Sequence, residues 1–195
     1  MFDGSLFRNK YYYTIRYTNA SKSLVEEFVN DMGLVYGLSD PYREIYDKGK
    51  CYRVTSRAKK AYEDLLSYTP YFYPSDSSSK IPEELVAAEK KIQLEILRAF
   101  WRDEGSIAFS GKLTAELRSK EIIYQLKSIH ENFDLYPQIS KYIDKDTRSY
   151  KLYLLKKDEI WEKFHKLDIF GPSLVARGSG MGRKKSDILK DLLKE

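Results

Sequence analysis

The stretch LRAFWRDEGSIAF, from Leu97 to Phe109, joins an apolar run to two adjacent acids, a Gly-Ser pair and a second apolar run. The first run is typical of a buried helix, and Gly105 is a helix-stop residue. Acids are unfavourable at a helix C-terminus because the macrodipole places partial negative charge there. Asp103 and Glu104 therefore occupy a costly position, and a bound cation is one way to offset that cost.

The composition indicates a globular chain. Charged residues make up 32% and hydrophobic residues 42%, no apolar run is long enough to span a membrane, and no signal-peptide pattern is present. One cysteine, Cys51, and two histidines, His130 and His165, exclude a disulfide framework and a zinc site of Cys/His type. We expect an intracellular protein, cytoplasmic or organellar, with no membrane partner. Its net charge of +5 favours a polyanionic partner.

The chain repeats its own pattern at an interval of about 100 residues. The segment DGSLF at 3–7 resembles EGSIAF at 104–109, and each is followed by a strand-like segment, a helix-like segment, a hairpin and a second amphipathic helix. The hairpins are expected to turn at 47–50 and at 144–148. The sequence therefore predicts an α+β fold made of two copies of strand-strand-helix-strand-strand-helix, related by a pseudo-two-fold axis.

A long helix, predicted over residues 82–103, precedes the second copy. Pro82 suits the first turn, and Glu83 and Glu84 suit the positive N-terminal end. The C-terminal part is apolar nearly all round, which predicts that it is buried. The chain then divides into a first repeat at 1–70, a linker at 71–81 and a second repeat at 82–195.

The predicted strands alternate between apolar and polar residues. In the strand at 11–18 the odd positions are aromatic or apolar and the even positions mainly polar, and 113–117 shows the same alternation. The polar face is either an ordinary solvated surface or a nucleic-acid-binding surface. The hairpins favour the second, since residues 41–60 hold seven Lys or Arg against two acids, and 141–157 hold six against two.

The nine residues LRAFWRDEG, from Leu97 to Gly105, resemble the LAGLIDADG signature, which Gly-Ser and an apolar residue commonly follow. With the internal repeat, the polar sheet faces and the trailing lysines, the whole chain from Asp3 onward resembles a two-motif LAGLIDADG homing endonuclease. The resemblance implies two pseudo-symmetric αββαββα repeats that meet through their signature helices. Their antiparallel, four-stranded sheets would form a DNA-binding saddle.

The resemblance also implies a metal site with one acid from each repeat. The eighth signature position carries the metal-binding acid, which is Glu104 in the second copy and Asp3 in the first, with Asp103 as a neighbour. Phosphodiester cleavage of this type uses cations that bridge the attacking water, the phosphate and the leaving oxygen. Mg²⁺ (or Mn²⁺) prefers oxygen ligands and keeps several waters, so two carboxylates and DNA phosphates suffice.

Further residues are implied around the cleavage centre. An amide at the end of the second strand helps to hold the water network, and this position is Asn19, with Ser119 as the weaker counterpart. A lysine after the last helix of each half helps to stabilise charge. The implied catalytic set is Asp3, Glu104, Asn19, Lys80 and Lys185. Without the resemblance, Asn19 would be interpreted as a helix-start residue and the lysines as solvated loop charges.

The first signature is incomplete, because only Met1 and Phe2 precede Asp3. Three explanations stay open: the chain is truncated or its start is misassigned, it is a degenerate relic, or another chain supplies the missing helix. We favour truncation or a misassigned start. A monomer is expected unless another chain supplies that helix.

The predicted function is a site-specific, divalent-metal-dependent endonuclease that cleaves a long double-stranded DNA target. The alternative is a catalytically inactive descendant that binds DNA as a regulator or intron RNA as a maturase. The residues predicted to face the DNA groove are Tyr12, Thr14, Arg16, Arg53, Lys112, Glu116, Arg118 and Lys151.

Overall fold

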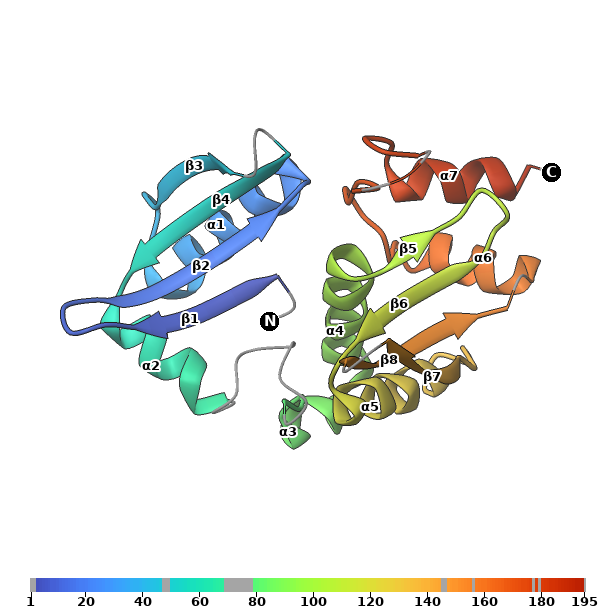
Figure 1. Ribbon diagram of the computed structural model, residues 1–195, viewed down its shortest axis with the longest axis horizontal. Coiled ribbons are helices and arrows are strands. Elements are labelled where there is room, and N and C mark those ends of the chain that lie inside the picture. The colour runs from blue at the N-terminus through green and yellow to red at the C-terminus, as the bar shows by residue number, and fades with distance from the viewer. Residues whose placement is uncertain are drawn as a thin grey trace. The chain divides into compact units, whose positions relative to one another are not determined.

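The computed structural model describes residues 3–46, 50–68, 79–144, 147–155, 157–176, 178 and 180–194. The chain divides into two compact units, residues 3–73 and 74–195. Each unit contains a four-stranded antiparallel sheet with helices packed against it (Figure 1). The predicted α+β class with two such sheets is therefore confirmed, whereas most of the two predicted hairpin turns lies outside the described residues.

The first unit is a sheet in the order β1-β2-β4-β3 with its helices on one face. Its elements are β1 (Gly4–Arg8), β2 (Tyr13–Asn19), α1 (Lys22–Tyr36), β3 (Tyr42–Tyr46), β4 (Cys51–Arg57) and α2 (Lys59–Tyr68). Leu6, Ile15 and Val54 point toward the helices and are almost completely buried, as the alternation predicted. Figure 1 looks onto the opposite, uncovered face of this sheet, with α1 behind it.

The second unit repeats this strand order as β5-β6-β8-β7. Its elements are α3 (Glu83–Val86), α4 (Lys90–Asp103), β5 (Ser106–Ile107), β6 (Leu113–Leu117), α5 (Lys120–Glu131), β7 (Gln138–Asp144), β8 (Thr147–Leu154), α6 (Asp158–Lys166) and α7 (Lys185–Leu192). Strands β1 to β4 thus correspond to β5 to β8, and α1 and α2 correspond to α5 and α6. The internal repeat predicted from the sequence is present in the fold.

The long helix predicted over 82–103 is two helices. It breaks between Val86 and Lys90, where Glu89 adopts an extended conformation (φ −58°, ψ 154°). The buried Gln93 side chain holds this break, because its Nε2 donates to the Val86 carbonyl at 2.7 Å while its Oε1 accepts from Asn132 at 3.0 Å. A side chain from α4 thus takes the carbonyl that a continuous helix would have used itself.

The C-terminal end of α4 is buried as predicted, since Leu97, Phe100 and Trp101 have no exposed surface. Trp101 Nε1 donates to His130 Nε2 at 2.7 Å, so the ring proton of His130 is on Nδ1 and donates to the Leu126 carbonyl at 2.7 Å. Burial lowers the pKa of His130 to about 4, which keeps the imidazole neutral. This hydrogen bond joins α5 to α4 inside the core.

Candidate functional site

The two predicted metal-binding acids occupy equivalent places in the two sheets. In the first unit Gly4 pairs with Tyr17, and extending the β5–β6 register by one residue places Gly105 opposite Ala115. Asp3 and Glu104 are the residues immediately before these glycines. Each acid therefore lies where the chain enters the first strand of its sheet.

In the first unit the structure brings Asp3 and Asn19 together. The Asn19 amide nitrogen donates to Asp3 Oδ2 at 2.6 Å, and the Thr18 backbone N–H donates to the Asp3 carbonyl at 3.3 Å. The same Asn19 side chain accepts from the Ser21 backbone N–H at 2.8 Å, at the start of α1. Asn19 thus orients the Asp3 carboxylate from the end of β2 while its own amide is fixed by the helix start.

In the second unit Glu104 directly follows α4, whose last residue is Asp103. Its backbone N–H donates to the Phe100 carbonyl at 2.9 Å, which fixes it as the C-cap of α4. The pKa of the Glu104 carboxyl is raised to about 7, mainly by burial and also by the adjacent Asp103 carboxylate, whereas the Lys185 ammonium acts to lower it. The folded chain therefore disfavours the Glu104 anion through burial and through the neighbouring Asp103 carboxylate.

Lys185 lies at the same helix end and is almost completely buried. Its ammonium donates to the carbonyls of Trp101 at 3.1 Å and Arg102 at 2.8 Å, so a cation meets the negative end of the α4 dipole. The position of Lys185 follows from the first turn of α7, where its backbone N–H donates to the Ser173 carbonyl at 3.0 Å. The structure thus brings together two predicted residues, Glu104 and Lys185.

The second unit has no amide at the place of Asn19. Ser119 caps α5 and is completely buried, with its hydroxyl donating to the Ser79 carbonyl at 2.5 Å. It lies four residues after Ala115, as the α1 N-cap Ser21 lies four residues after Tyr17. Ser119 is therefore the counterpart of Ser21 rather than of Asn19. The true counterpart of Asn19 is Leu117, which is apolar and buried.

Lys80 is exposed and makes an ion pair with Glu83 at 3.3 Å. The segment that carries it is held on α5, because the Ile81 backbone N–H and carbonyl each bond the Gln125 side-chain amide at 2.8 Å. Residues 79–81, predicted as the end of a linker, thus contact the second unit. Within the part of the chain that the structure describes, Lys80 forms no ion pair with Glu104.

The uncovered face of the first sheet carries arginines stacked on aromatic rings. Predicted residues Thr14, Arg16 and Arg53 lie on this face, although neighbouring side chains cover Thr14. The guanidinium carbon lies 4.6 Å from the ring centroid in Arg16–Phe7, 3.3 Å in Arg53–Tyr46 and 4.1 Å in Arg57–Tyr12. Tyr12 itself lies in the β1–β2 turn, because Asn9 Oδ1 accepts from its backbone N–H at 2.7 Å.

The equivalent face of the second sheet is less basic. Lys151 lies 3.6 Å from the Glu116 carboxylate, which also accepts from Ser149. Lys112 precedes β6, with its ammonium 5.9 Å from the Tyr153 ring centroid, and Arg118 follows β6 in an exposed position. All four predicted residues of this unit thus lie along the strands or at their ends, and the two central ones neutralise each other.

Arg57, which stacks on the predicted residue Tyr12, was not predicted from the sequence. The signal was available, since Arg53, Thr55 and Arg57 alternate on one face of β4. His130 was not predicted either, because its hydrogen bond to Trp101 has no local sequence signal.

The two candidate metal ligands, Asp3 and Glu104, are both carboxylates. Within the described residues no group of three or more His, Cys, Asp or Glu side chains is placed to hold a metal ion. Single carboxylates such as Asp3 and Glu104 still fit Mg²⁺ or Mn²⁺ if phosphate oxygens and waters complete the shell. The raised pKa of Glu104 also fits, because a carboxylate that is poorly stabilised as an anion gains from a nearby cation.

In metal-free buffer, E104Q is expected to gain stability relative to the wild type as pH rises. The folded state holds the Glu104 proton more tightly than the unfolded state does, because the carboxyl pKa is raised from 4.5 to about 7. The resulting stabilisation of the wild type is complete below pH about 4.5 and is lost as pH rises through about 7. Urea unfolding at several pH values should show the difference in unfolding free energy between the two proteins rising by about 3 kcal/mol over this range. A pH-independent difference would contradict the burial of Glu104.

No helix in the part of the chain that the structure describes is both long and apolar enough to cross a membrane. No protein-family model and no curated protein matches the chain by sequence.

Solved structures do match the chain. Mesophilic variants of the homing endonuclease I-DmoI give a TM-score of 0.63 at 17% identity, covering 85% of this chain and 88% of that one. I-DmoI in complex with DNA and Ca gives 0.60 at 18% identity, covering 85% and 82%. The N-terminal LAGLIDADG domain of DUF199/WhiA gives 0.54 at 17% identity, covering 91% and 78%. At these identities the likeness establishes the fold, and the chain therefore has the two-repeat LAGLIDADG fold.

Proposed function

We propose that the chain is a LAGLIDADG-type endodeoxyribonuclease that cleaves a long double-stranded DNA target with divalent metal ions. The observation that supports this is the placement of one acid per repeat at the same point of the fold, Asp3 before β1 and Glu104 before β5. An acid directly before the first strand of a sheet has no structural need to recur in both repeats. Its recurrence is explained if each acid serves the same chemistry.

Asp3 and Glu104 would each hold Mg²⁺ or Mn²⁺ together with DNA phosphate oxygens. When bound, the ion supplies Lewis-acid stabilisation of the phosphate and an activated water. Asn19 fixes the orientation of the Asp3 carboxylate through its 2.6 Å hydrogen bond. Lys185 belongs to α7, and its ammonium lies at the C-terminal end of α4, where it favours the ionised form of Glu104. Lys80, on an exposed segment, is proposed to contact the phosphate backbone of the DNA.

The two acids have different supports. Asp3 is held by an amide, whereas Glu104 has the Lys185 ammonium nearby and the apolar Leu117 where the amide would be. We therefore propose that the two repeats contribute unequally to cleavage, with each acid acting on its own strand of the duplex.

A second candidate is binding without cleavage, to DNA as a regulator or to intron RNA as a maturase. The missing amide at Leu117 favours it, because one half of the site lacks a group that would order water. The similarity to the LAGLIDADG domain of WhiA shows that this fold is also found outside proteins described as endonucleases.

Selection of bound duplexes from a random DNA library, with Ca²⁺ present, tests the proposal. We expect recovered duplexes to share a long target, to be cut when Mg²⁺ or Mn²⁺ replaces Ca²⁺, and to lose affinity steeply with rising salt. Binding without any cutting or nicking would favour the second candidate. Preference for structured RNA over duplex DNA would favour the maturase form. Absence of nucleic-acid binding at low salt would contradict both.

A further inference from the structure

We infer that Arg16 and Arg57 each recognise a guanine base in the part of the DNA target that the first sheet contacts. The inference rests on the proposed DNA-binding function and goes beyond it, because it assigns a base preference to two named side chains.

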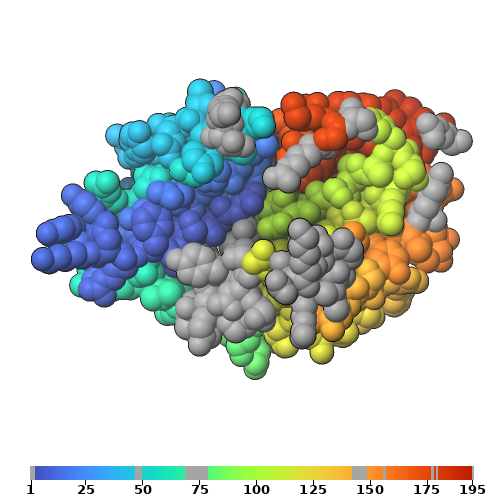
Figure 2. Space-filling view, viewed as in Figure 1, coloured from blue at the N-terminus to red at the C-terminus, as the bar shows by residue number. Residues whose placement is uncertain are grey.

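Both guanidinium groups are held in place on the uncovered face of the sheet. Arg16 stacks on Phe7 of β1 at 4.6 Å, and Arg57 stacks on Tyr12 of the β1–β2 turn at 4.1 Å. Residues 9–12 of this turn, in dark blue, project from the surface of the first unit (Figure 2). An aromatic ring against one face of a guanidinium restricts its motion and leaves the N–H groups around its edge pointing outward.

Neither guanidinium group donates a hydrogen bond to another described residue of the protein. Within the described residues neither arginine has an ion pair or a hydrogen bond, and the Arg16 Nε atom is buried without an acceptor. Arg53 on the same face is different: it donates to Glu44 at 3.0 Å and Thr18 at 3.2 Å. The donors of Arg16 and Arg57 are therefore available to a ligand, whereas those of Arg53 are largely used.

The chemistry of an ordered arginine fork favours guanine. A two-stranded or larger β-surface fits the major groove, where guanine presents two adjacent acceptors, O6 and N7, that match two parallel N–H donors. The same fork also fits a phosphate, so the distinction rests on position: a sheet face that enters the major groove presents its side chains to the base edges. Stacked arginines with unused donors on that face can therefore read base edges.

The register sets how far apart the two guanines lie. Arg16 pairs with Thr55, and Arg57 is two residues further along β4, so the two arginines are diagonal neighbours about 7–8 Å apart. Base pairs rise about 3.4 Å per step, so this separation corresponds to about two steps. The two guanines are therefore expected within three consecutive base pairs.

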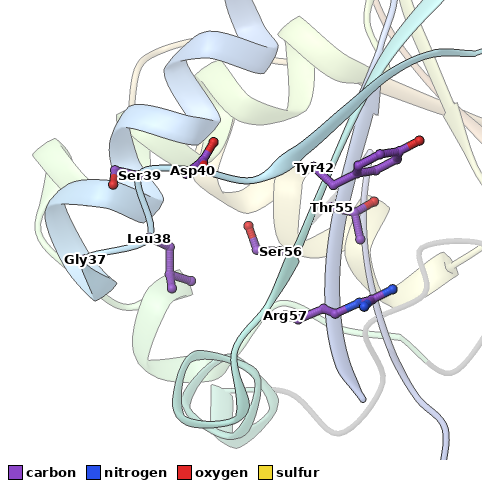
Figure 3. A pocket seen from close by; sticks show the side chains of 8 residues that line it. All are labelled: Gly37, Leu38, Ser39, Asp40, Tyr42, Thr55, Ser56 and Arg57. Carbon is purple, nitrogen blue, oxygen red and sulfur yellow. The ribbon is translucent and has the colours of Figure 1, made fainter. Parts of the chain in front are cut away.

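A cavity of about 540 Å³ borders Arg57 at the edge of the sheet. Its lining includes Leu38 and Ser56 on the helix-covered side, whereas Tyr42, Thr55 and Arg57 belong to the uncovered side. Figure 3 shows these three side chains on one side of β4 and Ser56 on the other. The corresponding face of the second sheet has Lys151 paired with Glu116, so the guanine preference is expected only in the target part read by the first sheet.

Binding-site selection with wild-type, R16Q and R57Q proteins tests the inference. The wild type should recover guanines at two positions within three base pairs. R57Q should lose one of these preferences by roughly 5- to 150-fold and gain adenine there, because glutamine pairs with adenine, and R16Q should do the same at the other position.

R8Q is the matched control. Arg8 is an exposed arginine of β1 that also stacks on a tyrosine, at 4.7 Å from Tyr13, but Tyr13 packs against the helix-covered core of the sheet. R8Q removes the same charge and should leave both guanine preferences unchanged. Circular dichroism confirms that each variant is folded before selection.

The outcomes distinguish a failure of the proposed DNA-binding function from a failure of the guanine assignment. If the wild type selects no DNA, the proposed function fails. If it selects a target whose base preferences R16Q and R57Q do not change, the guanine assignment fails while the DNA-binding function stands. If R8Q alters the same positions as R57Q, the effect is one of charge, which also overturns the assignment.

Discussion

Replacing Glu104 with glutamine is expected to reduce DNA cleavage by roughly a thousand-fold or more, while DNA affinity in Ca²⁺-free buffer stays within about two-fold. Glutamine keeps the shape of the side chain but removes the charge that would hold the metal ion. The C-cap position on α4 depends on the backbone N–H of residue 104, which the substitution does not touch. Cleavage and nicking of the selected duplex in Mg²⁺ measure the loss, and fluorescence anisotropy measures binding.

Asp103 supplies the matched control for this prediction. D103N removes the carboxylate next to Glu104 in the sequence. In the wild type this carboxylate raises the pKa of Glu104, but it is not the proposed metal ligand. We expect D103N to retain most of the cleavage, and D3N to impair cleavage as E104Q does. E104Q cleaving at the wild-type rate, or D103N failing as completely as E104Q, would overturn the assignment of Glu104 as the metal-binding acid.

Adding a single methyl group at Gly105 is expected to destabilise the second unit by about 3 kcal/mol or more. A Cβ there would lie 2.3 Å from Cε3 of the Trp101 ring, 2.6 Å from the Trp101 carbonyl oxygen and 2.9 Å from its Cα. Two of these atoms belong to the backbone of α4, and the indole is completely buried, so neither can move away cheaply. Urea unfolding of G105A followed by tryptophan fluorescence measures the change.

The control is G33A in α1, where an added Cβ would approach no atom closer than the Leu38 carbonyl at 3.9 Å. Alanine is more favourable than glycine in the interior of a helix, so we expect G33A to stabilise the protein by about 0.5–1 kcal/mol. G105A as stable as the wild type would show that the close approach of Gly105 to Trp101 is not a feature of the folded protein.

Much of the fold could be predicted because its signals are local and repeated. Alternation in β2 and β6 predicted which residues face the helices, and the match between 3–7 and 104–109 predicted the second copy of the sheet. Tyr12 was placed in a strand in error, although Asn9 carried the signal: an Asn side chain that accepts from the following backbone N–H groups is typical of a turn.

The rest depends on partners far away in sequence. The break before α4 requires the Gln93 side chain to reach back to Val86 and to be held by Asn132, with no Pro or Gly to mark it. Ser119 and Asn19 look interchangeable at the end of a strand, and only the pairing register separates the capping residue from the residue beside the acid. Local patterns cannot resolve such choices, because the deciding contacts form only when the elements pack.

The hydrogen bonds from Lys185 to the end of α4 also bear on the order of synthesis. They join residues 84 and 83 positions apart in the chain, so they close one of the longest loops in the second unit. A ribosome makes α4 well before α7, and long-range closures of this kind form late in folding. During that interval the Glu104 carboxylate would be present without the Lys185 ammonium beside it. The Glu104 carboxylate thus acquires its final electrostatic environment only when α7 emerges from the ribosome and docks on α4.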